Sequence, residues 1–251
     1  MKNILLKIAY DGTDFAGFQQ QEQQRTVAGV LQEAVETVTR RPTRLITAGR
    51  TDAGVHAEEQ LVNFLYTGTV PPHRMAQAVG RHLPEDLFCY ASREVPLDFH
   101  ARFAVTEKVY RYQLVNGPSR FPQDRRTWAW STYPLDRAAM ERCFPFFLGK
   151  HDFSAFSRWD PSRNAVREIH DLQMRWEGDR LRLWVRGQSF LYQQIRIMVG
   201  ALIDCGRGRL SQDDIIRALK RGGREPIAPT APACGLTLEE MTWVYPMPFR
   251  A

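Results

Sequence analysis

Apolar and polar positions in the first hundred residues follow two different periods. Residues 4–10 alternate weakly, as in a strand, whereas apolar side chains from Val27 to Val38 recur at helical spacing. Thr26 stands just before that run, where a helix N-cap is expected. The remaining pattern predicts two strands, a helix and a further strand, over residues 45–48, 61–66, 71–82 and 87–95. The resulting order, β-α-β-β-α-β, resembles a split βαβ unit.

The second part of the chain predicts a looser version of the same order. Alternating residues flank Glu177-Gly178-Asp179, which indicates a β-hairpin over residues 172–185. Ser211 with Asp214 resembles a capping box for a last helix that ends at Lys220. The other elements predicted are two strands, a helix kinked at its proline, a long helix and a closing strand, over residues 105–115, 128–130, 136–148, 190–205 and 236–245.

These elements predict an α+β protein with two halves, residues 1–104 and 105–251. Each half is expected to be a split-βαβ, ferredoxin-like unit, and their mainly antiparallel sheets are expected to join around a central cleft. The charge is uneven between the halves: the first carries 11 basic and 12 acidic side chains, the second 23 and 16. The basic half is therefore predicted to bind a polyanion, most often nucleic acid. An arginine-rich but merely solvated surface would give the same count.

Composition narrows the class of protein further. The 251 residues are 43% hydrophobic and 25% charged, and no run of 18 apolar residues occurs, so no membrane span is expected. Residues 1–6 are interpreted as the start of a first strand and not as a signal peptide. The four cysteines lie far apart, without a C-x-x-C pair. That spacing favours reduced thiols in a cytoplasmic protein over a disulfide framework or a zinc site.

One glycine-bracketed turn carries a candidate catalytic carboxylate. Asp52 lies between Gly49 and Gly54, where backbone can approach a ligand closely, and Arg50 beside it can keep the acid ionised or bind a phosphate. The spacing resembles a P-loop, but the lysine and hydroxyl residue that a P-loop requires are absent. By residue type alone, a glycine turn with an ordinary surface aspartate is the commoner outcome.

The residues around this turn resemble a known family. Gly-Arg-Thr-Asp-Ala-Gly-Val-His, at 49–56, is similar to the signature of the tRNA pseudouridine synthase A (TruA) family. Five further segments fit that family in order and rough spacing: 10–19, 98–112, 151–156, 187–200 and 231–236. Three features depart from the family pattern. Tyr192 and Gln193 stand where histidines are common, Phe18 stands where tryptophan is common, and the 157–166 loop is short. These departures bear on RNA contact and substrate choice.

The resemblance implies a role for four residues. Asp52 matches the catalytic aspartate, and Arg50 matches the arginine used in flipping out and replacing the target uridine. Tyr110 matches the aromatic residue that stacks on the target base. Arg196 matches the arginine that pairs with the aspartate. The resemblance also implies a homodimer that binds tRNA across both subunits and modifies uridines 38–40 of the anticodon stem-loop.

The chemistry gives independent reasons for these assignments. Isomerising uridine breaks the N1–C1′ bond and joins C5 to C1′, without redox change and without gain or loss of atoms, so no cofactor or metal is expected. One carboxylate suffices, as at other glycosidic centres. The base must leave its stack, and an aromatic ring such as Tyr110 recovers part of that cost. A buried arginine such as Arg196 needs a carboxylate partner, and Asp52 is the candidate.

Other charged residues have less definite assignments. His56 and Arg102 are candidates for substrate binding, and His56 is equally suited to shaping the turn by a structural hydrogen bond. Basic clusters at 120–126, 158–167, 180–186 and 207–224 are candidates for phosphate contacts, with solvated surface as the alternative.

Two competing hypotheses remain open at this point. The first is an RNA-binding module without catalysis, because a split βαβ fold with aromatic residues on its sheet can bind RNA. The second is a metal-dependent enzyme that uses Asp11, Asp14 and Asp52, which requires the first loop to fold over the turn.

Overall fold

The fold is that of a computed structural model, which describes residues 1–158, 164–223 and 226–244. The chain divides into two compact units: unit 1 is Met1–Thr106 with the chain from Thr237 onward, and unit 2 is Glu107–Leu236. Both contain a largely antiparallel sheet and helices. Within the described residues, no helix has the length and apolar character that crossing a membrane requires.

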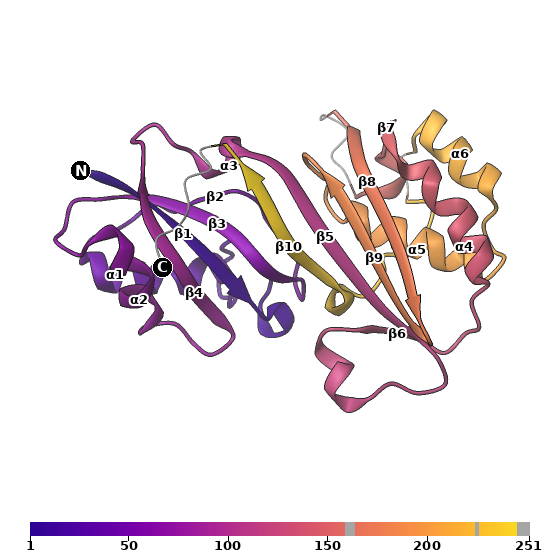
Figure 1. The fold of residues 1–251 in the computed structure, drawn as a ribbon, viewed down its shortest axis with the longest axis horizontal. Helices are drawn as coiled ribbons and strands as arrows, with labels where there is room; N and C mark the ends of the chain where they lie inside the picture. The colour runs from indigo at the N-terminus through magenta and orange to yellow at the C-terminus, as the bar shows by residue number, and fades with distance from the viewer. Residues whose placement is uncertain (159–163, 224–225, 245–251) are drawn as a thin grey trace. The chain divides into compact units, whose positions relative to one another are not determined.

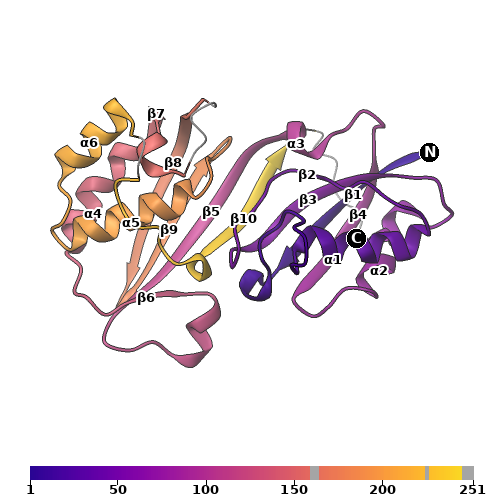
Figure 2. The same cartoon turned by 180° about the vertical axis from the view of Figure 1, so that it is seen from behind.

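Unit 1 consists of a sheet with helices on one face. Its elements are β1 (Lys2–Tyr10), α1 (Val27–Thr39), β2 (Ile46–Thr47), β3 (His56–Tyr66), α2 (Met75–Gly80), β4 (Leu87–Val95), α3 (Ala101–Ala104) and β10 (Leu236–Trp243). The strand order is β4-β1-β3-β10, and β2 pairs with β3. All of these pairs are antiparallel except β3 with β10. Helices α1 and α2 lie behind the sheet in Figure 1 and in front of it in Figure 2, so they cover the same face.

The apolar pattern of unit 1 explains this packing. Ile4, Leu6 and Ile8 of β1 are fully buried, as are Leu31 and Val35 of α1. Burying one such side chain stabilises the fold by about 1.5–3 kcal/mol relative to its exposure. The predicted strand and helix positions in this unit therefore coincide with the positions that form its core.

Unit 2 also consists of sheet strands with helices gathered on one side. Its elements are β5 (Val105–Asn116), β6 (Ala129–Ser131), α4 (Arg137–Cys143), β7 (Gly149–Asp152), β8 (Val166–Glu177), β9 (Arg180–Gly187), α5 (Gln194–Gly206) and α6 (Gln212–Arg221). The strands follow the order β5-β9-β8-β7 with antiparallel pairing, and β6 adds to β5 in parallel. Helix α5 lies behind β9 in Figure 1 and in front of it in Figure 2.

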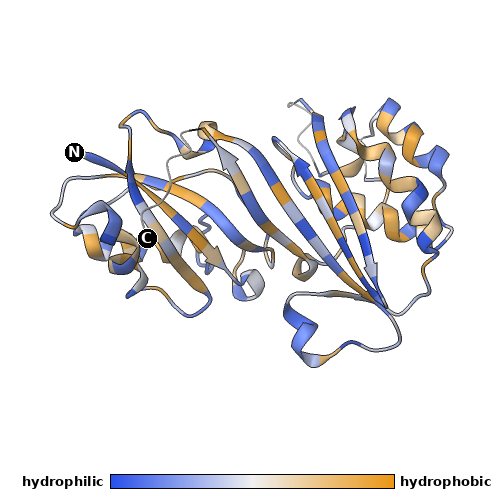
Figure 3. Cartoon of the chain, in the orientation of Figure 1, coloured by the Kyte–Doolittle hydropathy of each residue, from blue (hydrophilic) through white to orange (hydrophobic). Residues whose placement is uncertain are grey.

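Strand β9 shows how the sequence sets the two faces of this sheet. Leu181, Leu183 and Val185 are buried, while the residues between them are half-exposed. Figure 3 shows this alternation as apolar and polar bands along the strand. A period of two places every second side chain on the same face, so the apolar set forms the core with the helices.

Several predicted elements need correction. The predicted hairpin at Glu177-Gly178-Asp179 joins β8 to β9, and β5, α4, β8, β9 and α5 follow in the predicted order. The second half departs from β-α-β-β-α-β by the additional elements β6, β7 and α6, and by its last strand, β10, which pairs with β3 of unit 1. Helix α5 begins at Gln194 and not at residue 190, since Gln193 has the positive φ of 60°. Strand β7 and the short helix α3 were not predicted. The end of the predicted closing strand, Tyr245, lies outside the described residues.

The last strand belongs to a different unit from the one predicted. The two predicted halves end and begin at residue 104, close to the division after Thr106, but β10 groups with unit 1 from Thr237 onward. Thr237 and Leu238 of β10 pair with the start of β3. The Trp243 ring packs edge-on against Phe99, with ring centroids 5.8 Å apart. Sequence order alone could not show that this strand returns to the first unit.

Both predicted helix caps are confirmed, and the first gives a test of local stability. Thr26 Oγ1 accepts a hydrogen bond from Gly29 N at 3.2 Å, and Ser211 and Asp214 form the reciprocal capping box of α6. Thr26→Ala is expected to lower the free energy of unfolding by about 1 kcal/mol, because the helix loses an acceptor for an otherwise unpaired N–H. Urea denaturation measures this loss. Thr26→Ser is the control, and an equal loss in both variants would contradict the capping role.

Candidate active site

The turn that carries Asp52 connects β2 to β3, and side-chain hydrogen bonds hold its first residue. Gly49 O accepts hydrogen bonds from Thr47 Oγ1 at 2.7 Å and from Gln60 Nε2 at 3.1 Å. Asp52 itself is half-buried, and its carbonyl oxygen accepts a bond from Val55 N at 3.2 Å. The turn therefore has a fixed backbone shape before any substrate binds.

The first loop, residues 11–26, folds over this turn. Phe18 N donates to Thr51 O at 3.0 Å, and Gly54 N donates to Phe15 O at 3.3 Å. A hydrogen bond of 2.8 Å joins the hydroxyls of Tyr10 and Thr51. Tyr10 is buried, and this burial raises the pKa of its phenol well above the usual value, so the hydroxyl stays neutral. The loop thus fixes the turn on both sides of Asp52.

Two glycines make this close approach possible. A Cβ atom at position 12 would lie only 2.0 Å from Val55 O. Gly17 has a φ of 96° and lies against the backbone of Thr51, Asp52 and Ala53, where a Cβ atom would come within 3.1–3.3 Å. Only glycine combines that conformation with that proximity at low cost. The Gly12 and Gly17 positions are therefore part of the site.

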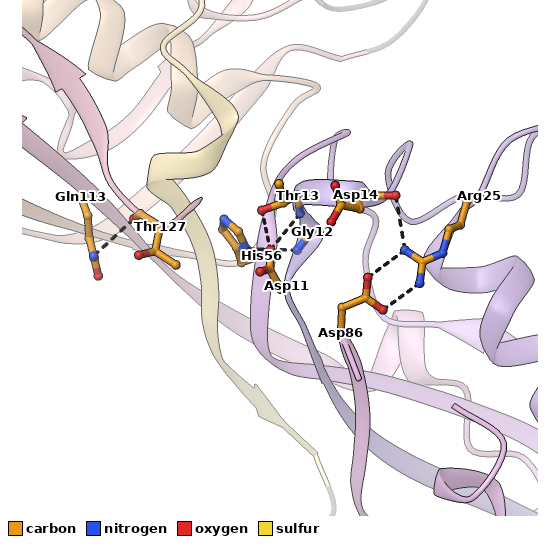
Figure 4. A network of polar contacts seen from close by, with 9 residues as sticks. All are labelled: Asp11, Gly12, Thr13, Asp14, Arg25, His56, Asp86, Gln113 and Thr127. Carbon is orange, nitrogen blue, oxygen red and sulfur yellow. Dashed lines mark hydrogen bonds and ion pairs between the residues drawn. The ribbon is translucent and has the colours of Figure 1, made fainter. Parts of the chain in front are cut away.

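An ion pair closes the first loop at its far end, as Figure 4 shows. The Arg25 guanidinium binds both carboxylate oxygens of Asp86, at 2.7 and 2.8 Å, and lies 4.0 Å from the centre of the Phe15 ring. Asp11 N also donates to Asp86 O at 3.0 Å. Bidentate pairs of this kind are geometrically specific. Arg25 thus anchors the loop whose Phe15 carbonyl holds Gly54.

His56 lies inside the site and is only 5% exposed. Its Nδ1 accepts a hydrogen bond from Gly12 N at 3.0 Å, which places the hydrogen of the neutral ring on Nε2. Asp11 Oδ1 lies 3.2 Å from the same Nδ1, a contact that is an ion pair only for a protonated ring. Among the described residues, no group accepts a hydrogen bond from Nε2.

The two predicted arginines of unit 1 reach the surface. Arg50 and Arg102 are both exposed. Arg102 lies on α3, which a buried asparagine pair fixes to the sheet: Asn63 Nδ2 donates to Asn3 Oδ1, and Asn63 Oδ1 accepts from Ala101 N, both at 2.9 Å. The Asn3 and Asn63 side chains therefore determine where α3 presents Arg102.

Tyr110 lies on β5, on the face of the unit 2 sheet that the helices cover. It pairs with Val185 in the register of β5 and β9 and is 8% exposed. The Phe190 ring meets it edge-on, with centroids 5.3 Å apart and planes at 86°. Such edge-to-face packing fixes the plane of an aromatic ring. Phe190 therefore orients Tyr110.

Arg196 lies on α5 and is half-buried. Its Nε donates to Ala231 O at 2.8 Å, and Ala231 N donates back to Arg196 O at 3.1 Å. The neighbouring Pro232 O accepts a bond from the Tyr112 hydroxyl at 3.0 Å. The segment 226–232 thus acts as a strap that fixes the Arg196 side chain through the backbone of Ala231.

The predicted site residues divide between the two units. Unit 1 contains Arg50, Asp52 and His56, which lie on or beside one turn, and Arg102, which lies on α3. Unit 2 contains Tyr110 and Arg196. Sequence reasoning missed the supporting groups, namely Gly12, Gly17, Arg25, Phe190 and Ala231. Gly12, Gly17, Phe190 and Ala231 lay inside the segments that resemble the family, which was the available signal, whereas Arg25 lay outside them.

The arginines of the basic cluster on β9, a candidate for phosphate contacts, are paired with carboxylates. Arg180 pairs with Asp124 at 2.6 Å, Arg182 with Glu177 at 2.6 Å and Arg186 with Glu107 at 3.3 Å. A phosphate would have to displace these carboxylates. The clusters at 158–167 and 207–224 lie partly outside the described residues. Across the described ranges, no three His, Cys, Asp or Glu side chains gather closely enough to hold a metal ion.

Comparison with known proteins identifies the family. The chain matches the sequence profile of tRNA pseudouridine synthase over residues 7–104 and 146–243. It is 40% identical to the tRNA pseudouridine synthase A of Halalkalibacterium halodurans over 239 residues, which is 94% of this chain and 90% of that protein. It is 39% identical to the protein of the same name from Acetivibrio thermocellus over 245 residues, 96% of this chain and 99% of that one.

The class defined by this fold and these matches is an isomerase that acts on RNA. The chain belongs to the tRNA pseudouridine synthase family. The resemblance stated from its sequence motifs is thereby confirmed. A chain from the crystal structure of an archaeal box H/ACA sRNP Nop10-Cbf5 complex also aligns, at 12% identity over 80% of this chain and 43% of that one. The TM-score of 0.32 is too low to bear on the fold.

Proposed function

We propose that this chain converts uridine to pseudouridine at positions 38–40 of the tRNA anticodon stem-loop, with Asp52 as the essential carboxylate. The observation that carries the proposal is the Asp52 turn. Its backbone is fixed by Gly49, Thr51 and Gly54 through hydrogen bonds to β3 and to the first loop. A carboxylate on a preorganised backbone can act on a sugar or base without reorganising first.

The chemical step requires one carboxylate from the protein. The N1–C1′ bond breaks, the uracil turns, C5 bonds to C1′, the hydrogen on C5 leaves and N1 gains one. The Asp52 carboxylate can attack C1′, attack C6 of the ring, or remove the C2′ proton. All three acts conserve atoms and electrons and require no cofactor and no metal.

The other residues supply base flipping and orientation in this proposal. Unstacking the target costs a few kcal/mol, and stacking on an aromatic ring returns about 1–3 kcal/mol. Tyr110 provides that ring, held by Phe190. Arg196 is the proposed guanidinium partner of the Asp52 carboxylate, and exposed Arg50 is proposed to assist in flipping and replacing the uridine.

His56 and Arg102 have different environments and therefore different proposed roles. The burial of His56 and its bond from Gly12 N support a role in shaping the turn over direct contact with substrate. The exposure of Arg102 supports contact with RNA phosphate.

We further infer a cytoplasmic homodimer. The strand order β4-β1-β3 with β2 on β3 supports a split βαβ, ferredoxin-like arrangement for unit 1.

Tritium release tests the proposed function. In tRNA labelled with [5-³H]uridine, each conversion sends the C5 tritium into water, so wild-type protein is expected to release up to one tritium per target uridine. Activity is expected to be unchanged in EDTA. Loss of activity in EDTA would favour the metal-dependent alternative. Binding of tRNA without tritium release, on every uridine-containing tRNA tried, would favour the RNA-binding module.

A further inference from the structure

The loop between β5 and β6, residues 117–128, projects from the edge of the unit 2 sheet (Figures 1 and 2). Its base is held by a bidentate pair: Asp124 Oδ1 and Oδ2 lie 3.3 and 2.6 Å from the Arg180 guanidinium. That guanidinium in turn lies 4.7 Å from the centre of the buried Trp128 ring. The loop is therefore tied to strand β9.

Further hydrogen bonds fix the path of the loop. Trp128 N donates to Asp124 O at 2.8 Å, and Trp128 O accepts from Arg120 Nη1 at 2.8 Å. Asp124 N donates to Phe121 O at 3.0 Å, which closes the 3-10 turn Pro122–Arg126. Pro122 stands at the start of that turn with its backbone φ restricted. These hydrogen bonds fix the backbone at the tip of the loop, residues 121–126.

Two side chains at this tip lack ring contacts, hydrogen bonds and ion pairs with the part of the chain that the structure describes. The Phe121 ring is 70% exposed and makes no ring contact with the described residues. Arg125 is also exposed and makes no hydrogen bond or ion pair among them, unlike Arg180, Arg182 and Arg186 on β9. Phe121 precedes the 3-10 turn Pro122–Arg126 and Arg125 lies within it. An exposed aromatic ring and an exposed guanidinium on one short turn can bind unpaired nucleotides, by stacking and by phosphate contact.

We propose that this tip is a second RNA contact, in which Phe121 stacks on an unpaired base of the substrate tRNA and Arg125 binds an adjacent phosphate. The inference rests on the proposed function. Tyr110 and Asn116 are six residues apart on β5, which is roughly 20 Å along a strand. The loop therefore starts several nucleotides away from the base that Tyr110 holds, and its contact serves binding and not chemistry.

Equilibrium binding of unmodified tRNA tests the contact. Phe121→Ala and Phe121→Leu are expected to raise Kd between about 5-fold and 150-fold, while Phe121→Trp keeps it near wild type, because stacking requires an aromatic face. Arg125→Ala is expected to lower the slope of log Kd against log salt by about one unit, and Arg125→Lys to preserve it.

Matched controls separate this contact from general surface effects. Phe88→Ala removes a ring that is 62% exposed on β4, and Arg175→Ala removes an arginine that pairs with Glu177 at 3.0 Å. Both are expected to leave Kd within about twofold, with melting temperatures of all variants close to wild type. Equal Kd for Phe121→Ala and wild type would overturn the proposal.

Two further outcomes would also overturn it. Equal weakening by Phe121→Ala and Phe121→Trp would show that stacking is not involved. A change of oligomeric mass in Phe121→Ala, without change in Kd, would assign the tip to a protein contact. Failure of the proposed function is distinguishable, because wild-type protein would then release no tritium, whatever the Phe121 variants do.

Discussion

An Asp52→Ala variant is expected to release tritium from labelled tRNA at least on the order of 10⁴-fold more slowly than wild type, since loss of an essential catalytic carboxylate has effects of this size. Asp52→Asn is expected to fail equally, because an amide neither attacks carbon nor accepts the proton. The backbone of the turn is held by Thr51 and Gly54, whose hydrogen bonds do not involve the Asp52 side chain. Folding should therefore be unaffected.

Binding separates loss of chemistry from loss of structure in these variants. Both Asp52 variants are expected to bind tRNA within a few-fold of wild type and to melt at a similar temperature. A variant that retains more than a hundredth of the wild-type rate would contradict the essential role of Asp52. A variant that no longer binds tRNA would place the residue in recognition and not in catalysis.

The second large effect is expected from Gly200→Ala, on the helix that carries Arg196. A Cβ atom at position 200 would lie 1.8 Å from Pro229 O, so the strap of residues 226–232 must move. The Ala231 carbonyl that holds Arg196 Nε moves with it. Displacing a catalytic group by about 1 Å can cost on the order of 100-fold, so kcat is expected to fall between about 10-fold and 100-fold while KM for tRNA changes little.

The pH profile distinguishes this effect from simple destabilisation. In the proposed mechanism Arg196 is the guanidinium partner of Asp52, so its displacement is expected to move the acid limb of kcat/KM to higher pH. Partial unfolding would instead lower the rate equally at every pH. Gly80→Ala on α2 is the control, because its nearest heavy atom, Cys89 O, lies 4.0 Å from the added Cβ. An unchanged kcat in Gly200→Ala would contradict the role of the strap in positioning Arg196.

Local sequence signals predicted helices and their N-caps in both units. The apolar spacing after Val27, the Thr26 cap and the Ser211 capping box depend on residues within one or two helical turns of each other. Such short-range preferences can be predicted from neighbouring residues in the sequence. The Asp52 turn was likewise found from its glycines and from the motif around it.

Long-range contacts account for what the sequence could not predict. Arg25 and Asp86 are 61 positions apart, and nothing local to either residue indicates the other. The need for glycine at position 12 comes from Val55 O, and the need at position 200 comes from Pro229 O. The order of strands in unit 2 depends on which strands pair across the sheet, which periodicity does not specify.

The most direct test of the central claim is to map pseudouridine, nucleotide by nucleotide, in unmodified tRNA treated with this protein and with its Asp52→Ala form. Carbodiimide labelling followed by primer extension gives the position of each pseudouridine. The expected map for wild type contains uridines 38, 39 and 40, where the tRNA has them, and the Asp52→Ala map contains none. An empty wild-type map, or the same map from both proteins, would contradict the account.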